Sequence, residues 1–130
     1  MDKTMLLDKD IENGKKVVER LDAKKAAVTS ALRFYDTKLS KWLLLIGMKD
    51  VKKDGPRISY SNLLKDLGDS LDIEVSDMYL IDSLDPLLQL IAIAIRTDEK
   101  SISGIRFSGN TINNTYIQDA YIYRLSIPQK

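Results

Sequence analysis

The chain contains no cysteine and no histidine, and only three prolines and six glycines in 130 residues. Without cysteine there can be no disulfide, thiolate nucleophile or cysteine-based zinc site. Without histidine there can be no Ser-His-Asp triad and no histidine-ligated metal. The phosphate-binding patterns G-x-x-x-x-G-K-[ST] and G-x-G-x-x-G are also missing. These absences remove most common hydrolase, dehydrogenase and NTPase sites. The sequence therefore favours a non-enzymatic role, and no pattern in it indicates a cofactor.

The chain also lacks an excess of either charge and any long apolar run. Its net charge is +1, with 44% hydrophobic and 30% charged residues, which is ordinary for a globular domain. No run approaches the roughly 20 apolar residues of a membrane span, and the N-terminus lacks the apolar stretch of a signal peptide. We expect a single soluble domain over residues 1–130, located in the cytoplasm and without membrane contact.

An amphipathic helix is the clearest local pattern, and it is expected to end near residues 22–25. Its apolar stripe follows a 3.6-residue period and includes a glycine, which costs about 1 kcal/mol relative to alanine. A glycine on the buried stripe indicates that another element approaches the helix closely there. The stripe consists of Leu7, Ile11, Gly14, Val18 and Leu21.

Two strands are predicted at residues 28–35 and 42–48, joined by a polar connection of hairpin length. The second strand is almost entirely apolar, so we expect it to be central and covered on both faces. A charged loop follows over 49–55. The apolar period then predicts a helix over 56–71, with Pro56 in its first turn, where a missing N–H is tolerated.

A third strand is predicted at 78–81, followed by a helix over 86–96. Asp85 suits the N-cap and Pro86 the first helical position. Residues 87–95 carry a single polar side chain, so this helix is expected to be buried almost all round. A buried strand is the alternative, because short apolar runs do not distinguish the two.

The last third of the chain predicts a long hairpin of strands 105–112 and 115–125. Asn113 and Asn114 suit a two-residue turn, because asparagine tolerates positive φ. Gly109 lies where the alternation of side chains changes parity, which predicts a β-bulge. The resulting order α-β-β-α-β-α-β-β predicts an α+β fold with three helices and a mostly antiparallel sheet of about five strands.

The hairpin is a candidate interaction surface because it is rich in tyrosine, arginine and asparagine. Tyrosine supplies rigid contact area and arginine a planar fork of donors. The alternative is that the tyrosines pack on the helices, since tyrosine is also a good strand former. Asp119 is expected to pair with Arg106 or Arg124 across the sheet, and the alternative is that it marks a site. The candidate surface comprises Arg106, Asn110, Asn113, Tyr116, Asp119, Tyr121, Tyr123 and Arg124.

A second candidate is a phosphate-contacting loop formed by Lys49, Lys52, Lys53 and Arg57. The alternative is an ordinary solvated connection, because neighbouring aspartates reduce its field. Four (D/E)-x-K triplets, a pattern of carboxylate–lysine nuclease sites, begin at Asp22, Asp36, Asp50 and Asp98. All four fall in predicted loops or at the ends of elements, and four such triplets are unremarkable in a chain whose loops are rich in lysine and aspartate.

Some segments resemble a family of small bacterial proteins to which no function is assigned. The resemblance rests on D-I-E-N-G-K-K at 10–16 with A-L-R-F-Y at 31–35, and on G-I-R-F-S-G-N at 104–110 with D-A-Y-I-Y-R-L at 119–125. It implies a bacterial origin and a stand-alone domain. It implies no activity, ligand or functional residue.

The sequence alone favours an accessory domain that binds a protein partner, or itself, through the C-terminal hairpin. The alternative is a protein that binds nucleic acid, or processes it with a metal ion. In that case, the lysine loop contacts phosphates and tyrosines stack on bases. A third hypothesis is a small-molecule enzyme that uses carboxylate and tyrosine groups. Only the presence of a pocket would support it.

Overall fold

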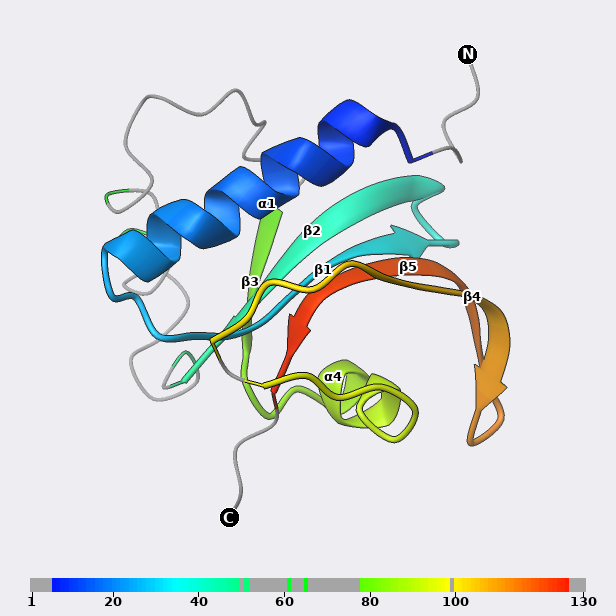
Figure 1. Ribbon diagram of the computed structural model, residues 1–130. Coiled ribbons are helices and arrows are strands. Elements are labelled where there is room, and N and C mark those ends of the chain that lie inside the picture. The colour runs from blue at the N-terminus through cyan, green and yellow to red at the C-terminus, as the bar shows by residue number, and fades with distance from the viewer. Residues whose placement is uncertain are drawn as a thin grey trace.

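The computed structural model describes residues 6–49, 51, 61, 65, 78–98 and 100–126, which form an α+β fold around one sheet (Figure 1). None of the helices in these residues is long and apolar enough to cross a membrane. The helices and strands are α1 (Asp8–Ala23), β1 (Val28–Asp36), β2 (Lys41–Met48), β3 (Met78–Asp82), α4 (Pro86–Ile91), β4 (Ile105–Ile112) and β5 (Thr115–Leu125).

The sheet has five strands in the order β3-β2-β1-β5-β4. The pairs β1–β2, β1–β5 and β4–β5 are antiparallel, whereas β2 and β3 run parallel, so the sheet is mixed. The expected five strands and the hairpin of β1 with β2 are confirmed. Two helices are present among the described residues. The third predicted helix, over 56–71, lies almost entirely outside them.

Helix α1 packs on one face of the sheet through its apolar stripe (Figure 1). Val17, Val18 and Leu21 are fully buried there. The predicted close approach at Gly14 is confirmed, because a Cβ on this residue would lie 2.2 Å from the Tyr123 Oη atom. The missing side chain therefore lets the tyrosine ring lie directly against the helix.

Two side chains from the sheet donate hydrogen bonds to the backbone of α1. The Tyr123 hydroxyl donates to the Ile11 carbonyl at 2.8 Å, and Nη2 of Arg33 donates to the Asp10 carbonyl at 2.9 Å. Burial raises the pKa of Tyr123 to about 12. The hydroxyl therefore stays protonated, and remains a donor, throughout the neutral range.

Helix α4 covers the opposite face of the sheet, where β5 and β4 curve around it (Figure 1). Its predicted N-cap is confirmed, since Oδ1 of Asp85 accepts from the Leu87 N–H at 2.9 Å. Two expectations are wrong. The helix ends at Ile91 rather than near residue 96, and it is not buried all round. Leu88 and Ile91 face the sheet, whereas Ile93, in the turn that follows, is 61% exposed. The short helix buries only the side that meets the sheet.

The β4–β5 hairpin closes through Asn113 and Asn114, which both have positive φ, as expected for this turn. The predicted bulge at Gly109 is absent. Ser108 pairs with Asp119 and Asn110 with Ile117 in unbroken register, although Gly109 has φ +62°. The glycine therefore accommodates an unusual backbone angle without adding a residue to the strand.

A register shift occurs instead between β1 and β5. Ala31 pairs with Arg124 and Leu32 with Ile122, which leaves Tyr123 as the extra residue. Because such a bulge breaks the alternation, Tyr123 and Arg124 both reach α1. Regular alternation along a strand would place two successive side chains on opposite faces of the sheet, and the bulge overrides it. This shift brings the Arg124 guanidinium to the Asp22 carboxylate near the end of α1.

Candidate functional site

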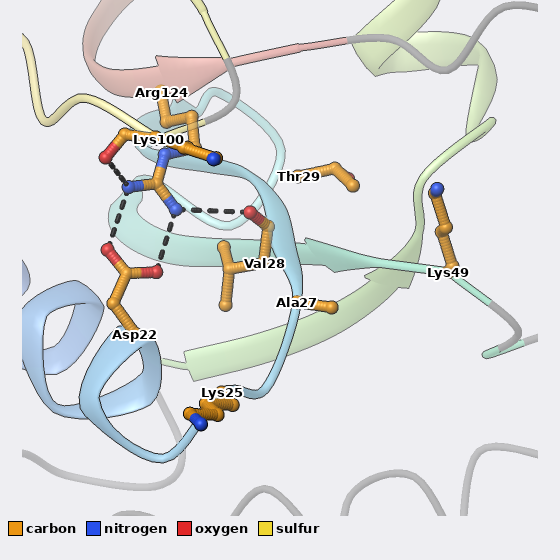
Figure 2. A pocket seen from close by; sticks show the side chains of 8 residues that line it. All are labelled: Asp22, Lys25, Ala27, Val28, Thr29, Lys49, Lys100 and Arg124. Carbon is orange, nitrogen blue, oxygen red and sulfur yellow. Dashed lines mark hydrogen bonds and ion pairs between the residues drawn. The ribbon is translucent and has the colours of Figure 1, made fainter.

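A pocket of about 440 Å³ lies where α1 ends and β1 begins (Figure 2). Its walls come from four separate parts of the chain: the end of α1 with the following connection and the start of β1, the residue after β2, the loop before β4, and the end of β5. A volume of this size is within the range of small-molecule sites. The lining residues are Asp22, Lys25, Ala27, Val28, Thr29, Lys49, Lys100 and Arg124.

The turn after α1 brings the first wall into place. The Ala26 N–H donates to the Leu21 carbonyl and the Lys25 N–H to the Asp22 carbonyl, which is a Schellman arrangement. Lys25 accordingly adopts the left-handed conformation, with φ 58°. The helix ending explains this angle.

Ala27 also has a positive φ, of 57°, but it has no such capping role. A left-handed non-glycine residue costs on the order of 1 kcal/mol or more, and such strain often occurs at ligand sites. The strained residue belongs to the pocket wall and directly precedes β1. Local strain therefore coincides with the cavity.

Arg124 fixes the walls relative to one another. It is 1% exposed, and each of its five N–H donors has an acceptor. Nε donates to the Ser101 carbonyl at 2.9 Å. Nη1 donates to Oδ1 of Asp22 at 2.9 Å and to the Val28 carbonyl at 3.1 Å, and Nη2 donates to Oδ2 of Asp22 and to the Lys100 carbonyl, both at 2.8 Å. This guanidinium joins α1, β1 and the loop before β4, and has no free donor for a ligand.

The loop before β4 has a local support of its own. The Asp98 carboxylate accepts from the Ser101 hydroxyl at 2.7 Å and from the N–H groups of Lys100 and Ser101 at 2.8 and 2.6 Å. These hydrogen bonds, that from the Ser101 side chain above all, lower the pKa of Asp98. The carboxylate thus stays ionised and holds the backbone that carries Lys100.

Three lysines give the pocket its electrostatic character. Lys25, Lys49 and Lys100 are exposed, and no described residue forms an ion pair with any of them. Asp22 is the only carboxylate among the described residues of the lining, and Arg124 already balances its charge in a two-pronged contact. The described lining therefore carries three lysine charges that no described residue pairs with.

One residue of the predicted phosphate-contacting loop belongs to the described lining of the pocket. Lys49 lies in the pocket, whereas Lys52, Lys53 and Arg57 lie outside the described residues. Lys25 and Lys100 were not predicted as site residues. They are 75 positions apart in the chain, and no local pattern in the sequence brings them together.

The predicted hairpin surface is only partly open. Arg106 forms a two-pronged ion pair with Asp119, at 2.6 Å from Nε to Oδ1 and 2.5 Å from Nη2 to Oδ2. This pairing was one of the two expected for the acidic residue, and it raises the pKa of Arg106. The guanidinium also lies 5.7 Å from the centre of the Trp42 ring.

The other hairpin residues divide by burial. Asn110, Asn113 and Tyr116 are exposed, Tyr116 by 61%. Tyr121 is half-buried, with its ring 5.3 Å from that of Tyr123. Tyr123 and Arg124 are buried, because the bulge in β5 directs them towards α1, so neither is available to a partner here.

The described residues contain no group of three or more acidic side chains placed to hold a metal ion. Among the (D/E)-x-K triplets, Asp22 is engaged by Arg124 and Asp98 by Ser101. Asp36 caps its own turn by accepting from the N–H groups of Lys38 and Leu39.

Comparison of the chain with protein-family models, with curated proteins and with solved structures found no match. The resemblance to small bacterial proteins therefore stays a prediction.

Proposed function

We propose that the chain binds an anionic ligand in the pocket between α1, β1 and the loop before β4, without reacting with it. The observation that carries the proposal is the set of three lysines around a cavity whose only described carboxylate is already neutralised by Arg124. Uncompensated charges of one sign around a cleft raise the local concentration of ligands of the opposite sign.

The magnitudes require the lysines to act together. Two unit charges about 4 Å apart attract by about 1 kcal/mol in bulk water and about 4 kcal/mol in the environment near a protein surface. Even a millimolar dissociation constant needs about 4 kcal/mol, before the loss of side-chain freedom is counted. A single exposed lysine falls short of this, whereas several lysines on one ligand reach it.

Binding is proposed rather than catalysis because the other polar groups of the lining have structural partners. Asp22 and Arg124 hold each other. The Thr29 hydroxyl donates to the Gly47 carbonyl at 3.2 Å. A general base needs a free, positioned side chain beside the group it acts on.

The proposal is tested by replacing Lys25, Lys49 and Lys100 together with alanine. Calorimetric titration at about 50 mM salt with citrate, pyrophosphate and tripolyphosphate is expected to show binding to the original protein. The triple variant is expected to bind at least about tenfold more weakly, because the attraction depends on unscreened charge.

The matched control replaces three exposed lysines of α1, Lys9, Lys15 and Lys16, which changes the net charge equally. Its affinity is expected to stay within about twofold, because these side chains do not line the pocket. Equal weakening in both triple variants, or no binding of any of the three anions, would contradict the proposal.

A second function, self-association through the hairpin, is favoured by the position of β4 at the edge of the sheet. Residues 108–111 of this strand and the nearby Tyr116 are exposed. Exposed edge strands can pair with another chain, and an exposed tyrosine supplies contact area at low entropic cost.

Light scattering at micromolar concentration tests this second function. We expect an assembly larger than a monomer that dissociates in Tyr116→Ser. The control Tyr79→Ser, which removes a 41% exposed tyrosine from the other edge strand, is expected to leave the mass unchanged. A strict monomer in the original protein would rule the hairpin out as a self-association surface.

A further inference from the structure

We infer that the ligand of the pocket is a chain of linked phosphates, recognised by its several charges and not by an attached base. This inference rests on the proposed anion-binding function and specifies the class of the anion. It follows from how the donors of the pocket are distributed, and from which donors are already used.

A single phosphate has no convergent set of donors in this pocket. Strong phosphate recognition usually employs an arginine fork or several N–H groups aimed at one point. All five donors of Arg124 are used by Asp22 and by three backbone carbonyls. The Thr29 hydroxyl proton is directed to the Gly47 carbonyl. Among the described lining residues, the lysines are thus the charged groups that remain to bind an anionic ligand.

The three lysines are spread around the cavity. They come from the turn after α1, the position directly after β2 and the loop before β4. Figure 2 shows Lys100 beside Arg124, Lys25 near the end of α1, and Lys49 on the far side of Thr29. Because the lysines come from three different segments, a ligand with several linked charges is better placed to contact all of them than a single small anion is.

The described lining also indicates what is not recognised. It contains no aromatic side chain, and proteins that hold a nucleic-acid strand or an unpaired base usually stack it on aromatic rings. A cavity of about 440 Å³ suits a compact ligand better than a long strand. An inorganic chain of phosphates and the triphosphate of a nucleotide share the required chemistry.

The test is a calorimetric series at about 50 mM salt with orthophosphate, pyrophosphate, tripolyphosphate, ATP and GTP. Affinity is expected to rise with each phosphate and to be at least about tenfold higher for tripolyphosphate than for orthophosphate. ATP and GTP are expected to match tripolyphosphate within about threefold, because neither base is contacted. A preference for ATP and GTP over tripolyphosphate would identify the nucleotide as the ligand and overturn the inference.

Single lysine variants show whether all three lysines bind the ligand or only one of them does. Lys25→Ala, Lys49→Ala and Lys100→Ala are each expected to weaken tripolyphosphate binding by about fivefold, as loss of one charge contact implies. If one substitution abolishes binding and the other two have no effect, a single-point site exists and the inference fails.

Citrate and a thymidine oligonucleotide distinguish this inference from the proposed function. Citrate carries three charges without phosphate. If it binds in the pocket as tightly as tripolyphosphate, anion binding stands and the phosphate class falls. If the oligonucleotide binds more tightly than tripolyphosphate, the ligand is a nucleic-acid strand instead. If the protein binds neither citrate nor any of the phosphates, the proposed anion-binding function itself is wrong.

Discussion

Replacement of Gly14 by alanine is expected to lower the free energy of unfolding by about 2 kcal/mol. The added methyl group would lie 2.2 Å from the Tyr123 Oη atom and 2.6 Å from Cζ, well inside van der Waals contact. Alanine favours a helix by about 1 kcal/mol over glycine, so its intrinsic effect is the opposite. The clash prevails because the ring is 1% exposed and its hydroxyl is tied to the Ile11 carbonyl.

Urea denaturation measures this effect, and two further variants identify its cause. Lys15→Ala, at an exposed neighbouring position, is expected to change stability by less than about 0.5 kcal/mol. In a Tyr123→Leu background, the additional cost of Gly14→Ala is expected to disappear, because the aromatic ring is gone. A Gly14→Ala protein as stable as the original would show that the ring can move aside at little cost.

Arg124→Met is expected to cost about 3 kcal/mol, the largest single loss we anticipate. Removing one member of a buried ion pair typically costs 3–5 kcal/mol, and the lower end applies because the Asp22 side chain is 37% exposed and can be rehydrated. The loss also leaves the carbonyls of Val28, Lys100 and Ser101 without this donor. Methionine fills a similar volume, so the change chiefly tests the hydrogen bonds.

Asp22→Asn provides the comparison, with an expected cost of about 1 kcal/mol, since an amide oxygen can still accept from the guanidinium. Both unfolding free energies, measured by denaturant titration, are expected to vary little with salt because Arg124 is shielded from solvent. If Asp22→Asn were as costly as Arg124→Met, the charge pair would outweigh the carbonyl contacts.

Features encoded by neighbouring residues could be predicted from the sequence. The period of α1, the Asp85-Pro86 start of α4 and the Asn113-Asn114 turn each depend on local backbone preferences. The glycine on the helix stripe revealed a close approach, although not which residue approaches. Local rules therefore yielded most elements and the broad α+β class.

Features that depend on distant residues could not be predicted. The parallel pairing of β2 with β3 depends on the path of the chain between them, which alternation does not encode. No glycine marks the bulge at Tyr123, so regular alternation along β5 does not predict the position of Arg124. The contact of Arg124 with Asp22 spans 102 positions, and the pocket depends on that contact.

The strand order has a consequence for the chain as it leaves the ribosome. β5 follows every other described strand in the sequence, yet it lies between β1 and β4. Until it is synthesised, β1 has an unpaired edge and β4 lacks its only neighbour in the sheet. Such edges invite association with other chains, and contacts between distant segments form slowly. A chain ending before residue 115 is therefore expected to expose unpaired strand edges that favour aggregation.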